Sequence, residues 1–253
     1  MYTQSQLTCD VRALGVRPDD VITVHTSLKA VGAIDAAGST GADIFIDAMR
    51  AAVPEGLLLI PTHTFRNIRE DGPVFNVRST MPCIGTVPCV AVIRANRAVD
   101  AGETTCVRSL HVSHSVAAFG SGAREFVRAD RLSHTRTPMT GSYGRLYDAG
   151  GKILLVGVDL TRNTFIHAVD EYIDATVYGS SVITVTDYDG ASWAHEELIT
   201  RGPAAATFNR YQTALEDAGA LVHGRVGDAP AMLVDARGCF ETVLKIRRGE
   251  EKT

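Results

Sequence analysis

The sequence lacks several features that would assign a function class at once. Its five cysteines form no CxxC pair, and it contains no GxGxxG or GxxxxGK[ST] loop, no HExxH pair and no apolar run of about 18 residues. These absences argue against a disulfide scaffold, a zinc ribbon, nucleotide sites of the dinucleotide and P-loop types, and a membrane span. Lysine and arginine (25) do not exceed aspartate and glutamate (29), so the net charge of −4 argues against a nucleic-acid binder.

What is present is an ordinary globular composition, with 45% hydrophobic and 21% charged residues. The 253 residues can bury a large core, and we expect a single domain over residues 1–253. Unpaired cysteines indicate a reducing compartment, and residues 1–4 lack the character of a signal peptide. We therefore expect a cytoplasmic protein that acts on a small molecule, with no membrane or nucleic-acid partner. A homodimer is compatible with the sequence.

Apolar segments typical of strands alternate with segments of helical periodicity. Residues 21–25, 57–60 and 153–158 are continuous apolar strands, and helices should follow Thr40 and Asn163. This pattern predicts an α/β fold with a largely parallel central sheet flanked by helices. Antiparallel strands should follow near the C-terminus. We also expect a hairpin at Asp189-Gly190, loops over residues 66–83 and 129–144, and a helix over Ser115–Phe119.

One segment, residues 163–171, concentrates groups suited to proton transfer. Asp170 and Glu171 follow His167 by three and four residues, so either carboxylate can share its helix face. A carboxylate on one imidazole nitrogen fixes the tautomer and leaves the other nitrogen free to accept a proton. The spacing therefore makes His167 a candidate general base, oriented by Asp170 or Glu171. The simpler alternative is a surface histidine in an acidic first turn.

Two other constellations are less specific. His111 and His114 stand three residues apart and could bind a metal, but no third ligand occurs at a typical spacing. Residues 25–29 and 61–64 each follow an apolar strand, which is where ligands bind in open α/β sheets.

Taken in order, these segments resemble the aminoglycoside 3-N-acetyltransferase family, also called the antibiotic N-acetyltransferase family. The matching stretches are residues 24–32, 54–62, 108–120, 146–148, 151–158 and 163–167. They extend over most of the chain. The resemblance implies the fold of that family, which is distinct from that of the GNAT acetyltransferases.

The resemblance also implies an activity linked to antibiotic resistance. The family moves an acetyl group from the co-substrate acetyl-CoA to a primary amine by direct attack, classically to the 3-amino group of a 2-deoxystreptamine aminoglycoside, and no metal is expected. His167 falls on the family's catalytic histidine, and Asp170 falls where the family usually has glutamate. The expected cofactor-binding residues are Thr26, Ser27, Leu28, Lys29, Arg78, Ser79, Thr80 and Gly85, and the expected substrate contacts are Thr62, His111 and Tyr143.

Some positions depart from the family pattern. Residues 78–85 replace a Thr-Pro-Ser stretch ahead of a Met-Gly pair, Val112-Ser113 replaces Pro-Thr, and no expanded acidic loop is present to bind a polycation. The alternatives are an acyltransferase that acts on a non-aminoglycoside amine, a covalent route through Cys83, Cys89 or Cys106, a metal-dependent amide hydrolase using His111, His114 and His167, and a catalytically silent binding protein.

Overall fold

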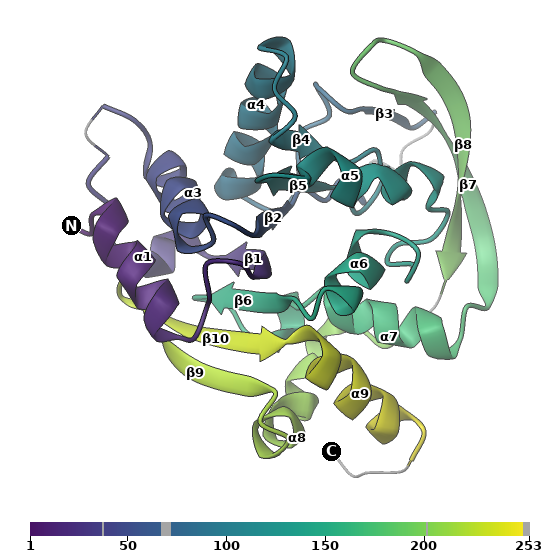
Figure 1. Ribbon diagram of the computed structural model, residues 1–253. Coiled ribbons are helices and arrows are strands. Elements are labelled where there is room, and N and C mark those ends of the chain that lie inside the picture. The colour runs from purple at the N-terminus through teal and green to yellow at the C-terminus, as the bar shows by residue number, and fades with distance from the viewer. Residues whose placement is uncertain (37, 67–71, 201, 250–253) are drawn as a thin grey trace.

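A computed structural model describes residues 1–36, 38–66, 72–200 and 202–249 (Figure 1). Within them, seven strands form a central sheet in the order β4-β5-β2-β1-β6-β10-β9. The central strands β2, β1 and β6 are parallel, and β10 and β9 add an antiparallel C-terminal portion. The predicted fold class is thereby confirmed. The strands are β1 (Val21–Thr26), β2 (Leu57–Pro61), β4 (Cys106–Arg108), β5 (Val116–Phe119), β6 (Lys152–Val156), β9 (Leu221–Val226) and β10 (Ala229–Asp235).

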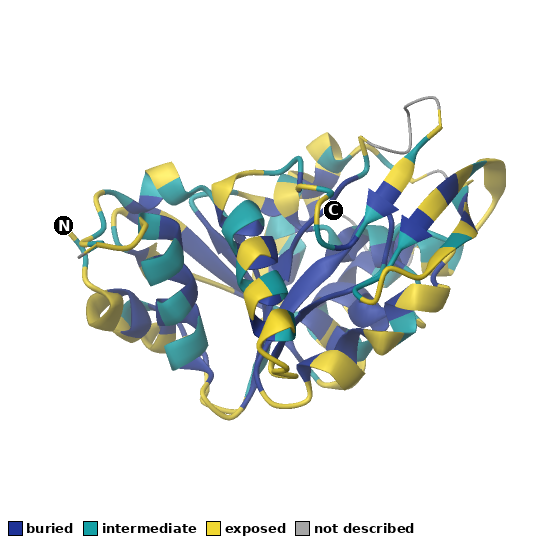
Figure 2. Cartoon of the chain, turned by 90° about the horizontal axis from the view of Figure 1, so that it is seen from above, coloured by how far each residue is buried: buried dark blue, intermediate teal, exposed yellow. Residues whose placement is uncertain are grey.

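Helices cover both faces of this sheet, because the central strands are apolar on both sides (Figure 2). In β2, Leu58 and Ile60 pack on one helix layer, whereas Leu57 and Leu59 pack on the other. None of the helices in the described residues could cross a membrane. The first layer contains α1 (Gln4–Ala13), α3 (Gly41–Ala52) and α4 (Thr86–Asp100); the second contains α5 (Ala123–Val127), α6 (Ser142–Asp148), α7 (Phe165–Ile173), α8 (Gln212–Asp217) and α9 (Ala236–Arg247).

A smaller sheet of β3 (Val74–Asn76), β7 (Val177–Thr186) and β8 (Ser192–Thr200) lies beside the first (Figure 1). The predicted hairpin is confirmed, because β7 and β8 pair antiparallel up to Thr186 and Ser192 on either side of the turn. The guanidinium of Arg108, at the end of β4, joins the two sheets. It donates hydrogen bonds to the carbonyls of Thr62, after β2, and of Val77, after β3.

Three sequence predictions of local structure differ from the structure. The predicted loop over residues 129–144 contains most of a 3-10 helix, Arg128–Leu132, and the start of α6. Residues 116–119 form β5 rather than the helix predicted over Ser115–Phe119, and Phe119 pairs with Leu58 of β2 and with Cys106 of β4. Tertiary pairing outweighs the helical preference of the two alanines here, since all four residues of β5 are buried between neighbours. The predicted loop over residues 66–83 contains the short strand β3, whose Phe75 is buried against β7. Residues 67–71 of that loop lie outside the described residues.

Candidate active site

A cavity of about 790 Å³ opens where the parallel strands β1, β2 and β6 end, which is the position that the sequence indicated for a ligand. Its walls come from segments far apart in the chain, including the end of β1, the residues before α4, the start of α7 and strand β8. The polar and charged lining residues are His25, Thr26, Ser27, His63, Arg66, Cys83, His114, Arg136, Thr161, Arg162, Asn163, Thr164, His167, Glu197 and Thr200.

His167 reaches this cavity from the first turn of α7. The Oδ1 atom of Asn163 accepts a hydrogen bond from the Phe165 N–H at 3.2 Å, and so helps to begin the helix. The His167 ring packs edge-on against Phe208, with 4.8 Å between the ring centroids. Its Nδ1 atom is buried without a hydrogen-bond partner among the described residues, and the Asp170 carboxylate lies 3.7 Å away. The ring is therefore held in place on one side and faces the cavity.

The two candidate orienting carboxylates lie in different surroundings. Asp170 is buried between His167 and Arg247 of α9, whose Nη1 atom is 3.0 Å from Asp170 Oδ1. Glu171 instead accepts hydrogen bonds from the Thr137 N–H at 3.2 Å and from the Thr200 hydroxyl at 3.4 Å. Asp170 is thus the carboxylate that lies beside the imidazole, whereas Glu171 connects α7 to a loop and to β8.

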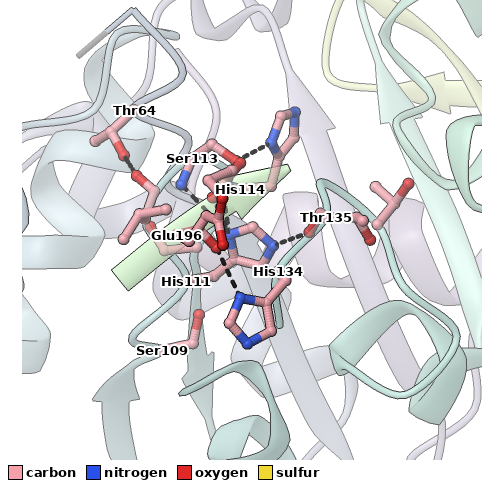
Figure 3. A network of polar contacts seen from close by, with 12 residues as sticks. Thr64, Ser109, His111, Ser113, His114, His134, Thr135 and Glu196 are labelled. Atoms are coloured by element: carbon pink, nitrogen blue, oxygen red, sulfur yellow. Dashed lines mark hydrogen bonds and ion pairs between the residues drawn. The ribbon is translucent and has the colours of Figure 1, made fainter. Parts of the chain in front are cut away.

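A buried histidine network forms part of the cavity wall and continues behind it (Figure 3). His111 Nε2 donates to the carbonyl of Thr135 at 2.7 Å, and Nδ1 accepts from the N–H groups of Ser113 and His114. This pattern fixes the proton of His111 on Nε2. The Ser113 hydroxyl donates to Glu197 and contacts His114 Nδ1 at 2.8 Å. The predicted substrate contact His111 therefore shapes this wall and is not among the cavity-lining residues.

Burial holds several of these groups uncharged. Desolvation lowers the pKa of His63 and of His114 well below the usual value for histidine, and their rings are 4.6 Å apart. Desolvation, with a smaller effect of Arg162, lowers the pKa of His25 to about 4. Burial also raises the pKa of the Glu197 carboxyl. The rings of His25, His63 and His114 are therefore neutral at neutral pH.

The residues predicted to bind the cofactor separate into two groups. Thr26 and Ser27 line the cavity, and the hydroxyl oxygen of Thr26 is buried with no hydrogen-bond partner in the part of the chain that the structure describes. Leu28 and Lys29 follow them at the start of α2 (Leu28–Val31). Thr26 and Ser27 thus lie at the carboxyl end of β1, and a role of this group in cofactor binding stays a prediction.

The second group, residues 78–85, lies largely away from the cavity. Arg78 pairs with Asp100 at 2.7 Å, and Thr80 accepts a hydrogen bond from the Asn76 N–H. Ser79, in the same turn, donates its N–H to the side chain of Asn76, and Gly85 is the N-cap residue of α4. From this stretch Cys83 and Ile84 line the cavity instead. A role for Arg78, Ser79, Thr80 and Gly85 in cofactor binding stays a prediction that their positions do not support.

The remaining predicted substrate contacts support the wall from behind. Thr62 is fully buried and shares hydrogen bonds with Ser115 and Arg108. The hydroxyl of Tyr143 lies 3.0 Å from Nε2 of His63, which itself lines the cavity. Neither residue is itself part of the lining.

Sequence reasoning missed four charged cavity residues, Arg66, Arg136, Arg162 and Glu197. Arg136 and Glu197 come from a loop and a hairpin strand that carry no motif. One signal was available in β8, where the period-2 alternation buries His195 and Glu197, so that polar residues occupy the inward face. An ordinary strand places apolar residues there.

Comparison with known proteins identifies the family. The model of the family described as aminoglycoside 3-N-acetyltransferase matches residues 23–246. The chain belongs to this family. Aminoglycoside N(3)-acetyltransferase III of Serratia marcescens is 30% identical to this chain over 186 residues. The match covers 66% of this chain and 63% of that relative, so the chain spans less than two thirds of the relative's length. Aminoglycoside N(3)-acetyltransferase IX of Micromonospora chalcea is 25% identical over 96% of this chain and 92% of that protein.

Solved structures of aminoglycoside acetyltransferases share the fold. AAC-IIIb in a binary complex with CoASH has a TM-score of 0.80 and 23% identity, covering 100% of this chain and 98% of that one. AAC-VIa bound to sisomicin has a TM-score of 0.76 and 21% identity, covering 100% and 99%. The fold is therefore that of the aminoglycoside 3-N-acetyltransferase family.

Proposed function

We propose that this protein transfers the acetyl group of acetyl-CoA to a primary amine. The observation that carries the proposal is the position of His167 in the cavity of a chain that belongs to the aminoglycoside 3-N-acetyltransferase family. At about 790 Å³, the cavity lies within the usual range of ligand pockets, roughly 300–1,000 Å³.

His167 acts as the general base in the proposed reaction. Its Nδ1 edge faces Asp170, so Nε2 is the nitrogen that takes a proton from the substrate ammonium. The freed amine attacks the thioester carbonyl and a C–N bond forms. As the C–S bond breaks, the second proton that the nitrogen must lose goes to the CoA thiolate, and His167 releases the first proton to solvent. The 3.7 Å gap between Nδ1 and Asp170 shortens to a hydrogen bond when substrates bind, as is common for catalytic contacts in free enzymes.

Thr26 and Ser27 are the residues of this chain best placed to bind CoA. The buried Thr26 oxygen has no partner within the described protein, so a ligand polar group can satisfy it. Arg162 lines the same cavity and is close enough to His25 to contribute to its lowered pKa, and Lys29 is exposed two residues after Ser27, so both can pair with phosphates. The relative AAC-IIIb binds CoASH, which supports this co-substrate.

Direct attack is better supported than a covalent cysteine route. Burial raises the pKa of Cys89, and it raises that of Cys106 to about 12, so neither thiol readily forms the nucleophilic thiolate. Cys83 lines the cavity, but its thiol donates a weak hydrogen bond to the carbonyl of His63. A metal-dependent hydrolase is not favoured either, because no three His, Cys, Asp or Glu side chains in the described ranges are grouped as metal ligands.

The test is thiol release from acetyl-CoA in the presence of amines. The names of the relatives make the 3-amino group of a 2-deoxystreptamine aminoglycoside the first acceptor to try. The proposal predicts amine-dependent release of one thiol per N-acetylated product, identified by mass spectrometry. Saturable CoA binding without turnover on any primary amine would contradict it and favour a silent binding protein.

A further inference from the structure

The charge of the cavity is unusual for a site that binds a polycation. Among the described residues that line it, three are arginines (Arg66, Arg136 and Arg162), and the one acidic residue is Glu197. An aminoglycoside carries several ammonium groups, and electrostatic complementarity requires carboxylates around it. The described residues of the cavity wall carry mainly positive charge instead.

The single carboxyl group among the described lining residues is poorly suited to bind a cation. Glu197 is 1% exposed, and one of its oxygens already accepts the hydroxyl proton of Ser113. Burial raises the pKa of this carboxyl and so disfavours its charge. The neighbouring acids Asp170 and Glu171 do not line the cavity, and each is already engaged by protein groups.

The arginines lie on different walls. Arg162 belongs to the wall of His25 and Ser27, where the phosphates of CoA account for a cation. Arg136 comes from the loop before α6, and its Nη2 atom donates to the carbonyl of Thr200 in β8 at 3.0 Å. In the described part of the chain, no carboxylate lies within ion-pair distance of Arg136. Its other N–H groups remain available to an anion beside His114 and Glu197.

We propose that the acceptor is a primary amine that also carries an anionic group, a carboxylate or a phosphate, and that Arg136 binds that group. This inference rests on the proposed acetyl transfer and narrows its substrate. A planar guanidinium anchored through one N–H can present a fork of donors to either anion. The anchored anion would position the amine for deprotonation by His167. Acceptors that differ only in the anion should therefore differ in kcat/KM.

The test compares matched acceptors with acetyl-CoA in the thiol-release assay. An ω-amino carboxylate is compared with its carboxamide, and an aminoalkyl phosphate with its amino alcohol; a 2-deoxystreptamine aminoglycoside is the third arm. We expect kcat/KM for the better anionic acceptor to exceed that of its uncharged counterpart by about 10–100-fold, since a hydrogen bond to a charged group contributes about 1.5–3 kcal/mol. The two pairs distinguish a carboxylate from a phosphate.

Variants test whether Arg136 causes the preference for an anionic acceptor. Arg136→Gln should raise KM for the anionic acceptor and remove the preference, with the KM for acetyl-CoA unchanged, and Arg136→Lys should recover part of it. The matched control Arg162→Gln should raise KM for acetyl-CoA and keep the acceptor preference. Circular dichroism checks that each variant is folded. The comparison of matched acceptors uses the wild-type enzyme, so it tests the proposal even if a variant does not fold.

Four outcomes would overturn the proposal. A higher kcat/KM for the aminoglycoside, or equal values within each matched pair, would reject the anionic acceptor while leaving acetyl transfer intact. An effect of Arg136→Gln on acetyl-CoA alone would make Arg136 a CoA contact. Failure of every amine to release thiol would reject the proposed function as well.

Discussion

At the scale of single residues, the proposed general-base role of His167 depends on which carboxylate orients its imidazole. Asp170 and Glu171 are adjacent in sequence, yet one lies beside the imidazole and the other connects α7 to Thr137 and Thr200. Asp170 is also paired with Arg247, which neutralises a carboxylate that would otherwise be buried alone. The hydrogen-bonding partners of each carboxylate therefore assign it a role that spacing alone left open.

We predict that Asp170→Asn lowers kcat by about 10²-fold or more, because loss of the group that orients a catalytic imidazole costs up to about 10⁴-fold. Glu171→Gln is the matched control; its amide oxygen can still accept from Thr137, so kcat should stay within a few fold. Steady-state kinetics with acetyl-CoA measures both. Equal losses in the two variants would contradict the assignment.

The buried His25 predicts a pH dependence of stability. In the folded protein its pKa is lowered to about 4, whereas an unfolded histidine titrates near 6.5. As pH falls below about 6.5, the unfolded state binds the proton first, so stability is lost at up to ~1.4 kcal/mol per pH unit until about pH 4. Urea unfolding between pH 7 and 4.5 should show this decline, and a smaller slope in His25→Gln. An unchanged slope in the variant would assign the decline to other groups.

At the scale of elements, the sequence predicted the central strands better than the neighbouring strand β5 and the hairpin that packs beside them. Continuous apolar runs identified β1, β2 and β6, because buried parallel strands need apolar side chains on both faces. The helix predicted at Ser115–Phe119 failed because two alanines in β5 gain more from pairing with β2 and β4 than from local helix propensity. Arg136 and Glu197 could not be placed, since their approach to His167 depends on how the hairpin packs.

The turn after β6 depends on glycine. Gly157 has a φ of +64°, and an added Cβ would lie 2.4 Å from the Cβ of Ala30 in α2. We predict that Gly157→Ala lowers the free energy of unfolding by about 2–4 kcal/mol through backbone strain and overpacking. Gly190→Ala has a similar φ of +82° with open space around it, so about 1–2 kcal/mol is expected there. Urea denaturation of both variants measures the difference, and equal losses would mean that the α2 contact does not matter.

At the scale of the whole molecule, Arg108 joins the two sheets. Its guanidinium is buried without a carboxylate partner among the described residues, and it donates to carbonyls of Thr62, Val77 and Thr80. Desolvation lowers its pKa to about 10, which still leaves it charged at neutral pH. A charge held by carbonyls from both sheets is consistent with residues 1–253 folding as one domain, which stays a prediction.

Unfolding tests that prediction. The single tryptophan, Trp193, lies in β8 of the smaller sheet, so its fluorescence follows that sheet, whereas far-UV circular dichroism follows the whole chain. One domain predicts coincident urea transitions. Arg108→Met should lower stability by about 3–5 kcal/mol, since each buried carbonyl left unsatisfied costs about 1–3 kcal/mol. Arg128→Met, on the surface, is the control. An earlier fluorescence transition in the wild type would indicate two units.

The general-base role of His167 is tested most directly by the rate of amine acetylation in the His167→Ala variant. The control is His223→Ala, which alters an exposed histidine paired with Glu216. Loss of a general base predicts a fall in kcat of about 10²–10⁴-fold with little change in KM for acetyl-CoA, while the control retains the wild-type rate. A folded His167→Ala variant that acetylates at the wild-type rate would contradict the account.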